Sequence, residues 1–353
     1  MWLFLIEKSL ILALETKRCL KINLTFILLI FCIFVSAQND STNSQVVSYD
    51  KNIMLRLNLD TNIDEFVVSS RELGIKPKLA LNSQINTTFG LDYKFISASI
   101  SFAPDFLPGN NDNNFKGKSS FTSYNFRFFP KNIIQTLSYK NSKGYYISNT
   151  RDFVSDWQKG RDQYLQFPNL RIQSFEGSTS YIINKEFSLK GIYYQKEWQP
   201  QSSGSFVPSL NYKYFIFSDN QNSLKSREHQ LDLNFDIAYH YNYVITKNIN
   251  IAPFAYEGLG KKWSSYKNDV TRNEPEEQNY FTQNFGAGLH LGYNSEKFFF
   301  GSKFNYSGNH YTENDSNVVQ NDFYVLFFIG YRLNAPSKVK RVYEKIQEKI
   351  PTL

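Results

Sequence analysis

The chain has 353 residues, is rich in aromatic residues (17%, with 32 Phe and 24 Tyr) and carries a formal net charge of +7. Its mean hydropathy of −0.43 excludes a protein built from several membrane-spanning helices, but fits a β-barrel, in which only alternate residues face lipid. The basic excess is mild and spread along the chain, so no nucleic-acid-binding surface is expected.

The N-terminal region has the pattern of an export signal. Basic residues at positions 17, 18 and 21 precede an apolar run at 24–35, and the small residues Ser36 and Ala37 follow it. This pattern predicts a signal peptide over residues 1–37, cleaved after Ala37. A membrane anchor is the alternative, but the run is short for a span of roughly 20 residues. A second apolar stretch at residues 2–14 leaves the start codon open.

Both cysteines, Cys19 and Cys32, lie in this segment, so we expect no disulfide in the mature chain. Residues 38–50 are mostly Asn, Ser, Thr and Gln, which predicts a polar linker before the first strand.

From residue 51 to 333 apolar and polar residues alternate, which predicts strands with two different faces. The segments concerned are residues 53–59, 65–70, 79–91, 96–102, 123–128, 206–217, 231–245, 281–291, 298–306 and 323–333. The first two are less regular, and the last has apolar residues on its polar side, so it is expected to be buried on both faces.

Residues 231–245 show the alternation most clearly. Leu, Phe, Ile and Tyr fill the odd positions, whereas Asp232, Asp236 and His240 lie on the opposite face. Spans of a transmembrane barrel need roughly 9–11 residues of this kind. We therefore predict an all-β fold, an antiparallel up-and-down transmembrane β-barrel of about 12 strands, with a range of roughly 10–14. A soluble periplasmic β protein is the alternative.

The predicted connections differ in length. Short turns are expected at 130–131, 184–185, 246–247 and 294–296, and long polar loops at 104–116, 148–167, 198–204, 259–278 and 307–319. Short periplasmic turns and long extracellular loops are typical of outer-membrane barrels. Residues 206–217 and 231–245 would both run towards the periplasm, so the region 198–230 contains either a missed strand or a linker that crosses the barrel.

Residues 334–353 have a different pattern. Val339, Tyr343, Ile346 and Ile350 recur at helical spacing among lysines and arginines, which predicts a short basic amphipathic helix. It would lie on an anionic membrane surface or close the near end of the barrel, and a frayed solvated tail is the alternative.

Ten polar residues are predicted to face the lumen of the barrel. They are Asp92, Arg127, Lys140, Glu176, Asp232, Asp236, His240, His290, Lys303 and Arg332. One interpretation is an interior that selects ions or solutes. A network of mutually compensating charges is favoured, because a barrel of about 12 strands has little room for an open channel.

The histidines give no motif for chemistry. None has metal-ligand spacing to another ligand, and none is followed by the His-x-Ser spacing of one outer-membrane lipase type. We therefore expect no metal, no cofactor and no enzyme. The alternative is a lipid-modifying enzyme that uses His240 or His290 with nearby Ser and Asp groups.

Several aromatic residues fit an interfacial girdle, where an aromatic body meets lipid and a polar tip meets water. They are Tyr239, Tyr241, Tyr243, Trp198 and Trp263. A carbohydrate-binding platform is the alternative.

Short motifs along the chain resemble one family. They are Tyr49-Asp50-Lys51 leading into Leu55-Arg56-Leu57, then Lys116-Gly117-Lys118, Lys143-Gly144-Tyr145-Tyr146, Gly204-Ser205-Phe206 and Gly330-Tyr331-Arg332. The resemblance, over residues 49–333, is to the Bacteroidota outer-membrane protein family of domain of unknown function 4421. It implies an exported barrel and no established activity, so no functional residue is carried over.

The sequence thus predicts an outer-membrane β-barrel of a Gram-negative bacterium over residues 51–333. The expected partners are outer-membrane lipid and lipopolysaccharide, the barrel-assembly machinery during insertion, and a small solute or a surface protein. We expect a small pore or a structural, surface-interacting barrel. The alternatives are the lipid-modifying enzyme and an accessory component of a surface export or uptake complex.

Overall fold

The structure is a computed structural model that describes residues 46–61, 66–67, 76–221, 224–268, 276–313, 316–341 and 343. The predicted signal peptide at 1–37 lies outside the described residues. No helix in the described part of the chain is long and apolar enough to cross a membrane.

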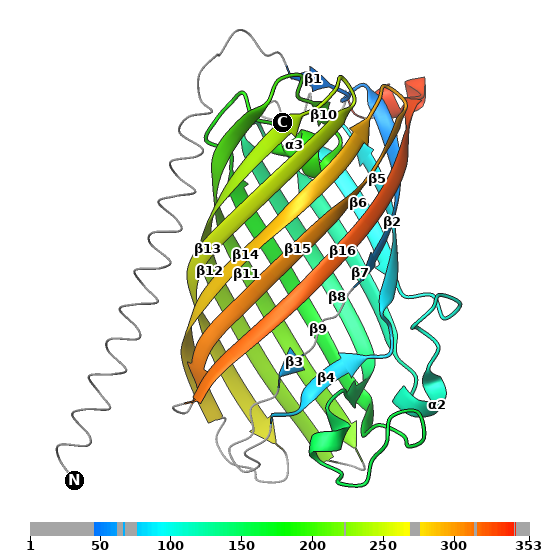
Figure 1. Cartoon of the computed structure of the whole chain (residues 1–353), viewed down its shortest axis with the longest axis vertical. Coiled ribbons are helices and arrows are strands. Elements are labelled where there is room, and N and C mark those ends of the chain that lie inside the picture. The colour runs from blue at the N-terminus through cyan, green and yellow to red at the C-terminus, as the bar shows by residue number, and fades with distance from the viewer. Residues whose placement is uncertain are drawn as a thin grey trace, which may run out of the picture. The chain divides into compact units, whose positions relative to one another are not determined.

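Twelve of the described strands form a closed antiparallel barrel, which confirms the predicted fold (Figure 1). In order around the wall they are β2 (Asn52–Thr61), β5 (Ile85–Tyr93), β6 (Ile96–Phe102), β7 (Ser120–Phe128), β8 (Ile133–Ile147), β9 (Gln166–Tyr181), β11 (Ser203–Gln221), β12 (Leu224–Val244), β13 (Ile249–Asn268), β14 (Glu276–Asn294), β15 (Phe298–Glu313) and β16 (Ser316–Asn334). The pairing of β16 with β2, in which Asn334 lies opposite Asn52, closes the wall.

The predicted alternation determines which side chains face outwards. On β12 the Phe235 and Ile237 side chains are 52% and 51% exposed, whereas His240 is 8% exposed. Exposed Leu, Ile, Phe and Tyr side chains continue around the other strands and form an apolar belt on the outside of the wall. A closed wall leaves no unpaired strand edge, and this belt is what lipid requires of a membrane-spanning barrel. The protein is therefore an outer-membrane β-barrel.

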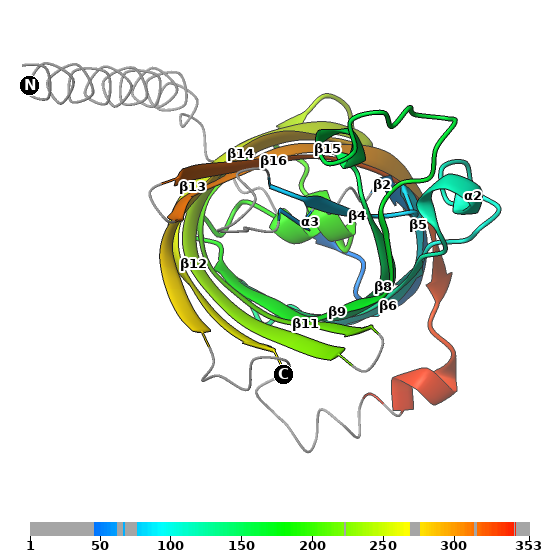
Figure 2. The same cartoon turned by 90° about the horizontal axis from the view of Figure 1, so that it is seen from below.

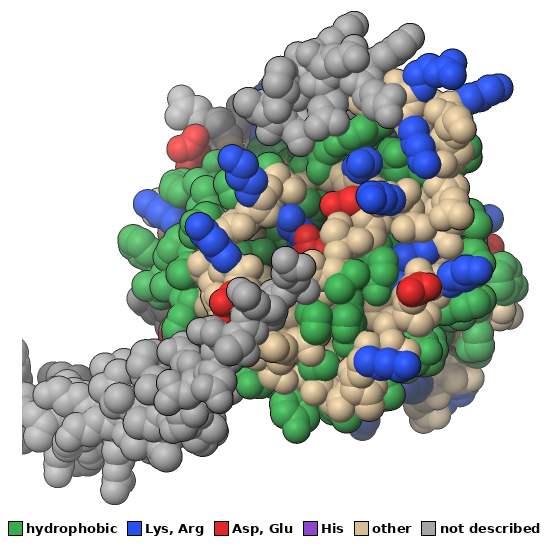
Figure 3. Space-filling model, turned by 90° about the horizontal axis from the view of Figure 1, so that it is seen from above, with side chains coloured by type: hydrophobic (Ala, Val, Ile, Leu, Met, Phe, Trp, Pro, Cys, Tyr) green, Lys and Arg blue, Asp and Glu red, His purple; other side chains and the backbone are tan. Residues whose placement is uncertain are grey.

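The short turns share one end of the barrel with the start of β2 and the end of β16, at the top of Figure 1. We identify it as the periplasmic end, because short turns of outer-membrane barrels lie there. The predicted turns at 130–131, 246–247 and 294–296 are confirmed. Figure 3 shows Lys and Arg side chains distributed over this end face. Exposed lysines on its turns include Lys131, Lys185, Lys247 and Lys297.

The prediction was wrong for the region 182–202. The turn at 184–185 does not join two barrel strands, and 198–204 is not an extracellular loop. Instead, α3 (Leu189–Tyr194) and β10 (Glu197–Trp198) follow β9 and remain at the periplasmic end. Consequently, β11 runs outwards and β12 returns, which explains the apparent conflict of direction around residues 198–230.

Two predicted extracellular loops are mostly strand. β13 reaches Asn268 and β14 starts at Glu276, while Glu313 of β15 pairs with Ser316 of β16. The polar residues there misled the prediction, because a strand that projects beyond the membrane into water needs no apolar face. The loops predicted at 104–116 and 148–167 are confirmed and contain α2 (Asn113–Lys116) and the 3₁₀ turn η1 (Thr150–Asp152).

The wall is uneven in height. β5, β6 and β7 have 9, 7 and 9 residues, whereas β11 to β14 have 19 to 21. A span needs roughly 9–11 residues, so the first group barely crosses a membrane and the second projects far beyond it. On the extracellular side, β4 (Lys78–Leu81) continues the sheet beside the end of β8 and pairs with β3 (Phe66–Val67).

The chain ends also pack at the periplasmic end. Val47–Ser48 form β1, which pairs with Trp198 and Glu197 of β10, so the predicted linker at 38–50 does not extend through its last residues. Residues 337–341 are helical, and the Tyr343 ring lies 5.6 Å from Tyr93 and 5.7 Å from Phe95. The predicted C-terminal helix is therefore present at its start, and residues 344–353 lie outside the described residues.

Candidate functional site

The barrel encloses a cavity of about 700 Å³. Eight of the ten residues predicted to face the lumen line it: Arg127, Lys140, Glu176, Asp232, Asp236, His240, His290 and Lys303. The other two, Asp92 and Arg332, also point inwards but are buried at the periplasmic end, with 0% and 2% exposure.

Most lumen carboxylates are paired within the wall. Lys140 Nζ lies 3.1 Å from Glu176, and Lys262 Nζ lies 3.6 Å from Asp232. Asp236 accepts a hydrogen bond of 2.7 Å from the amide of Asn211. This part of the lumen is the compensating charge network that the sequence analysis favoured.

A plug closes much of the periplasmic end of the lumen. We call residues 182–202 the periplasmic plug; Figure 2 shows its helix α3 across the lumen. Ser188 caps α3 by accepting a hydrogen bond of 2.8 Å from the Gly191 amide, and the helix is only six residues long. Such a short helix depends on tertiary packing. Its Leu189 and Ile192 side chains are buried.

The apolar side of the plug packs against the inner face of the wall. Its buried members are Ile182, Phe187, Leu189 and Ile192, and the wall contributes Phe129, Ile134, Val207 and Ala252. This cluster explains why some inward-facing wall positions near the periplasmic end are apolar.

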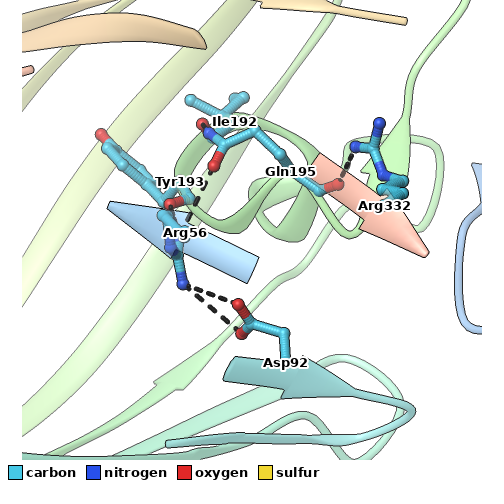
Figure 4. A network of polar contacts seen from close by, with 6 residues as sticks. All are labelled: Arg56, Asp92, Ile192, Tyr193, Gln195 and Arg332. Atoms are coloured by element: carbon cyan, nitrogen blue, oxygen red, sulfur yellow. Dashed lines mark hydrogen bonds and ion pairs between the residues drawn. The ribbon is translucent and has the colours of Figure 1, made fainter. Parts of the chain in front are cut away.

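Two arginines hold the end of α3, one from each of the two strands, β2 and β16, that pair to close the barrel (Figure 4). Arg56 of β2 forms an ion pair of 3.1 Å with Asp92 and donates to the Tyr193 carbonyl at 3.4 Å. Arg332 of β16 donates to the Gln195 carbonyl and, at 2.6 Å, to Asn294 Oδ1. Both arginines are buried, so the plug is bound by charge-assisted hydrogen bonds that water does not reach easily.

The N-terminal segment that precedes β2 covers this contact. The Tyr49 ring lies 3.7 Å from the Arg332 guanidinium, and the Tyr49 amide donates to the Lys196 carbonyl at 2.9 Å. Burial lowers the pKa of Lys196 below its ordinary value. Trp198, predicted to belong to an interfacial girdle, is instead buried in the plug, whereas Trp263 is 37% exposed on the wall.

A second apolar cluster lies at the extracellular end of the lumen. Leu79, Tyr145, Ile147 and Ile172 are buried there. The Phe66 ring of β3 packs edge-on against Tyr145 at 6.2 Å and Phe217 at 5.7 Å. Figure 2 shows β4 passing across this mouth, so the polar middle of the lumen lies between this apolar cluster and the apolar cluster of the plug.

His240 and His290 meet the plug at Tyr193. The Tyr193 hydroxyl lies 3.2 Å from His240 Nδ1, and the ring packs edge-on against His290 at 5.9 Å. Burial raises the pKa of Tyr193 well above 10. Within the described residues no group of His, Cys, Asp and Glu is arranged to hold a metal, and no Ser or carboxylate hydrogen-bonds either histidine. The enzymatic alternative therefore stays a prediction.

Comparison with known proteins identifies the family. The model of the Domain of unknown function (DUF4421) matches residues 38–333. The chain belongs to this family. The DUF4421 region thus includes β1, the plug and all twelve barrel strands up to Leu333. The match confirms the family resemblance seen in the short motifs. A search of curated proteins gave no match.

Solved outer-membrane structures resemble this DUF4421 protein weakly. The β domain of the Bordetella autotransporter BrkA is 9% identical, with 81% of this chain and 100% of that one covered and a TM-score of 0.40. An outer membrane channel from Pseudomonas putida F1 is 9% identical, with 84% of this chain and 98% of that one covered and a TM-score of 0.38. LpxR from Salmonella typhimurium is also 9% identical, with 79% of this chain and 99% of that one covered and a TM-score of 0.35.

Sequence reasoning located the lumen wall of this DUF4421 protein but missed the plug. It did not identify the plug residues that contact the wall from inside, which are Tyr193, Tyr194 and Gln195. Arg56 was noted only as part of a family motif. The available signal was local: alternation stops after residue 182, and Ser188 followed by Leu189 and Ile192 has the pattern of a capped short helix.

Proposed function

We propose that the protein is a gated pore of the outer membrane and that the periplasmic plug is its gate. The observation that carries the proposal is the contrast between the polar cavity and the plug that occupies its periplasmic end. The plug is not part of the wall: among the described strands, its strand β10 pairs with β1 alone, through Trp198 and Glu197. The barrel wall is complete without it, because β9 pairs directly with β8 and β11.

The contacts of the plug are suited to release. Apart from backbone hydrogen bonds of Ile182 and Ile183, where the chain leaves β9, they are side-chain contacts to Arg56, Arg332 and Asn294 and an apolar cluster, rather than continuous strand pairing. A plug held in this way can leave the lumen as a unit, whereas a wall strand cannot leave without opening the barrel. The closed state accounts for the narrow interior that the sequence analysis expected.

Conductance in planar bilayers tests the proposal. We expect little current from the full chain and a steady current from a variant in which residues 184–201 are replaced by a short Gly-Ser linker. The variant must first show the heat-dependent gel shift of a folded barrel. If it is folded and carries no current, the protein is a structural barrel and the proposal is wrong. The point variant Arg332→Met provides a second test, since it loosens the plug and leaves the strands intact.

Export and membrane contacts complete the proposal. We infer that residues 1–37 act as a signal peptide, that the assembly machinery inserts the barrel, and that the apolar belt contacts lipid and lipopolysaccharide. The belt of exposed apolar side chains supports the membrane contacts. N-terminal sequencing of the protein purified from outer membranes tests export, and we expect a mature chain that starts at Gln38.

A further inference from the structure

The part of the lumen next to the plug contains two cations without a carboxylate partner in the described part of the chain. Arg127 and Lys303 both line the cavity and take part in no ion pair there. Like charges that line the same cavity repel each other. By contrast, Lys140 and Lys262 are paired with Glu176 and Asp232.

Aromatic rings of the plug lie against these two cations. Lys303 Nζ lies 4.5 Å from the centre of the Tyr193 ring and 5.3 Å from that of Phe254. The Arg127 guanidinium lies 5.4 Å from the centre of the Tyr194 ring. An aromatic ring stabilises a cation less than a neighbouring anion would, because the ring has a quadrupole and no formal charge.

We propose that Arg127 and Lys303 bind the oxyanion group of a small organic solute at the floor of the lumen. The guanidinium can hold a carboxylate or phosphate through two parallel hydrogen bonds, and the ammonium adds a point charge. The rings of Phe254 and Phe328 line the same cavity and offer a surface for the carbon part of the solute. A volume of about 700 Å³ lies within the usual range of small-molecule sites, roughly 300–1,000 Å³.

This site rests on the proposed function in one respect, since it couples the solute to the gate. Tyr193 and Tyr194 belong to α3, so an anion that draws Arg127 and Lys303 away from the two rings weakens the attachment of the plug. A solute of this class would then favour its own passage.

Calorimetric titration of the mature full chain in nanodiscs tests the site with the plug in place. Citrate probes carboxylates and inorganic phosphate probes phosphates, both at low chloride concentration. We expect saturable binding of at least one of them, and affinity weakened about tenfold or more by Arg127→Gln and by Lys303→Gln. Lys303→Arg, which keeps the charge, should restore most of the affinity.

Lys262→Gln is the matched control, because this lysine lies in the same lumen but is paired with Asp232. Its affinity should stay within about twofold of the parent protein. The site is wrong if the parent protein binds neither probe, or if Lys262→Gln weakens binding as much as Lys303→Gln. The two proposals can fail separately. If the plug-deleted variant conducts but the parent protein binds neither probe, the anion site is wrong and the pore stands. If the parent protein binds a probe but the plug-deleted variant carries no current, the pore is wrong and the anion site stands.

Discussion

The side chain of Arg332 donates a hydrogen bond to the backbone carbonyl of Gln195, which lies 137 residues earlier in the chain. Arg332 belongs to β16, the strand that closes the barrel by pairing with β2. Gln195 ends the helix of the plug. The contact can therefore form only when the last strand is in place, and it links closure of the wall to seating of the plug.

Replacing Arg332 by Met should loosen the plug without unfolding the barrel. The carbonyl groups of Gln195 and Ser295 and the Asn294 amide oxygen would lose a charged donor. We expect a loss of roughly 1–3 kcal/mol for each acceptor left buried without a partner. Urea denaturation in detergent, followed by tryptophan fluorescence, measures the change.

Arg171→Met is the control for this substitution, because Arg171 is an exposed arginine of β9 whose side chain, within the described part of the chain, donates only to Asn141. It should change stability by less than about 0.5 kcal/mol. Equal effects of the two substitutions would show that Arg332 does not hold the plug.

The phenol of Tyr193 should ionise only well above pH 10. Burial raises its pKa well above 10, whereas in the unfolded chain it ionises near 10. Its burial therefore contributes stability that is present below pH 10 and is lost as the pH rises through the folded value. The difference in absorbance at about 295 nm between the parent protein and Tyr193→Phe should show a step displaced to high pH. A difference that titrates near pH 10 would mean that the ring is solvated.

Gly330 should not tolerate a side chain. A Cβ there would lie 2.1 Å from Cζ of Phe299, which is fully buried, and 2.7 Å from the Leu55 carbonyl oxygen. Gly330→Ala should cost about 1–3 kcal/mol, as overpacking of a well-filled interior does. Gly90→Ala is the matched control, because a Cβ at that position on β5 meets its neighbours at 3.5 Å or more. The same loss in both variants would contradict the packing argument.

The barrel could be predicted from sequence because its information is local. Alternation with period two shows each strand and assigns its faces, so the side chains of Asp232, Asp236 and His240 were placed correctly before their partners were known. The plug could not be predicted in this way. Its decisive contacts, such as Arg56 with Tyr193 and Arg332 with Gln195, join residues 137 positions apart. Which wall side chains face it depends on closure of the whole barrel.

The N-terminal strand should act as a latch on the plug. Tyr49 stacks on Arg332 at 3.7 Å, and β1 pairs with β10, where Trp198 is 8% exposed. Tyr49→Ala removes the ring that shields Arg332, so water reaches the contact with Gln195 and weakens it. We expect acrylamide to quench Trp198 more strongly in this variant than in the parent protein, with the Trp198→Phe variant supplying the signal of the other tryptophans.

A matched control for the latch is Tyr243→Ala, which removes a tyrosine that is 55% exposed on the outer face near the same end. It should leave the quenching of Trp198 unchanged. In bilayers, Tyr49→Ala should open more often than the parent protein but less than the plug-deleted variant, because the contacts of Arg56 and the apolar cluster remain. Unchanged quenching in Tyr49→Ala would mean that Arg332 holds the plug without the latch, and β1 would then only cover the end of the barrel.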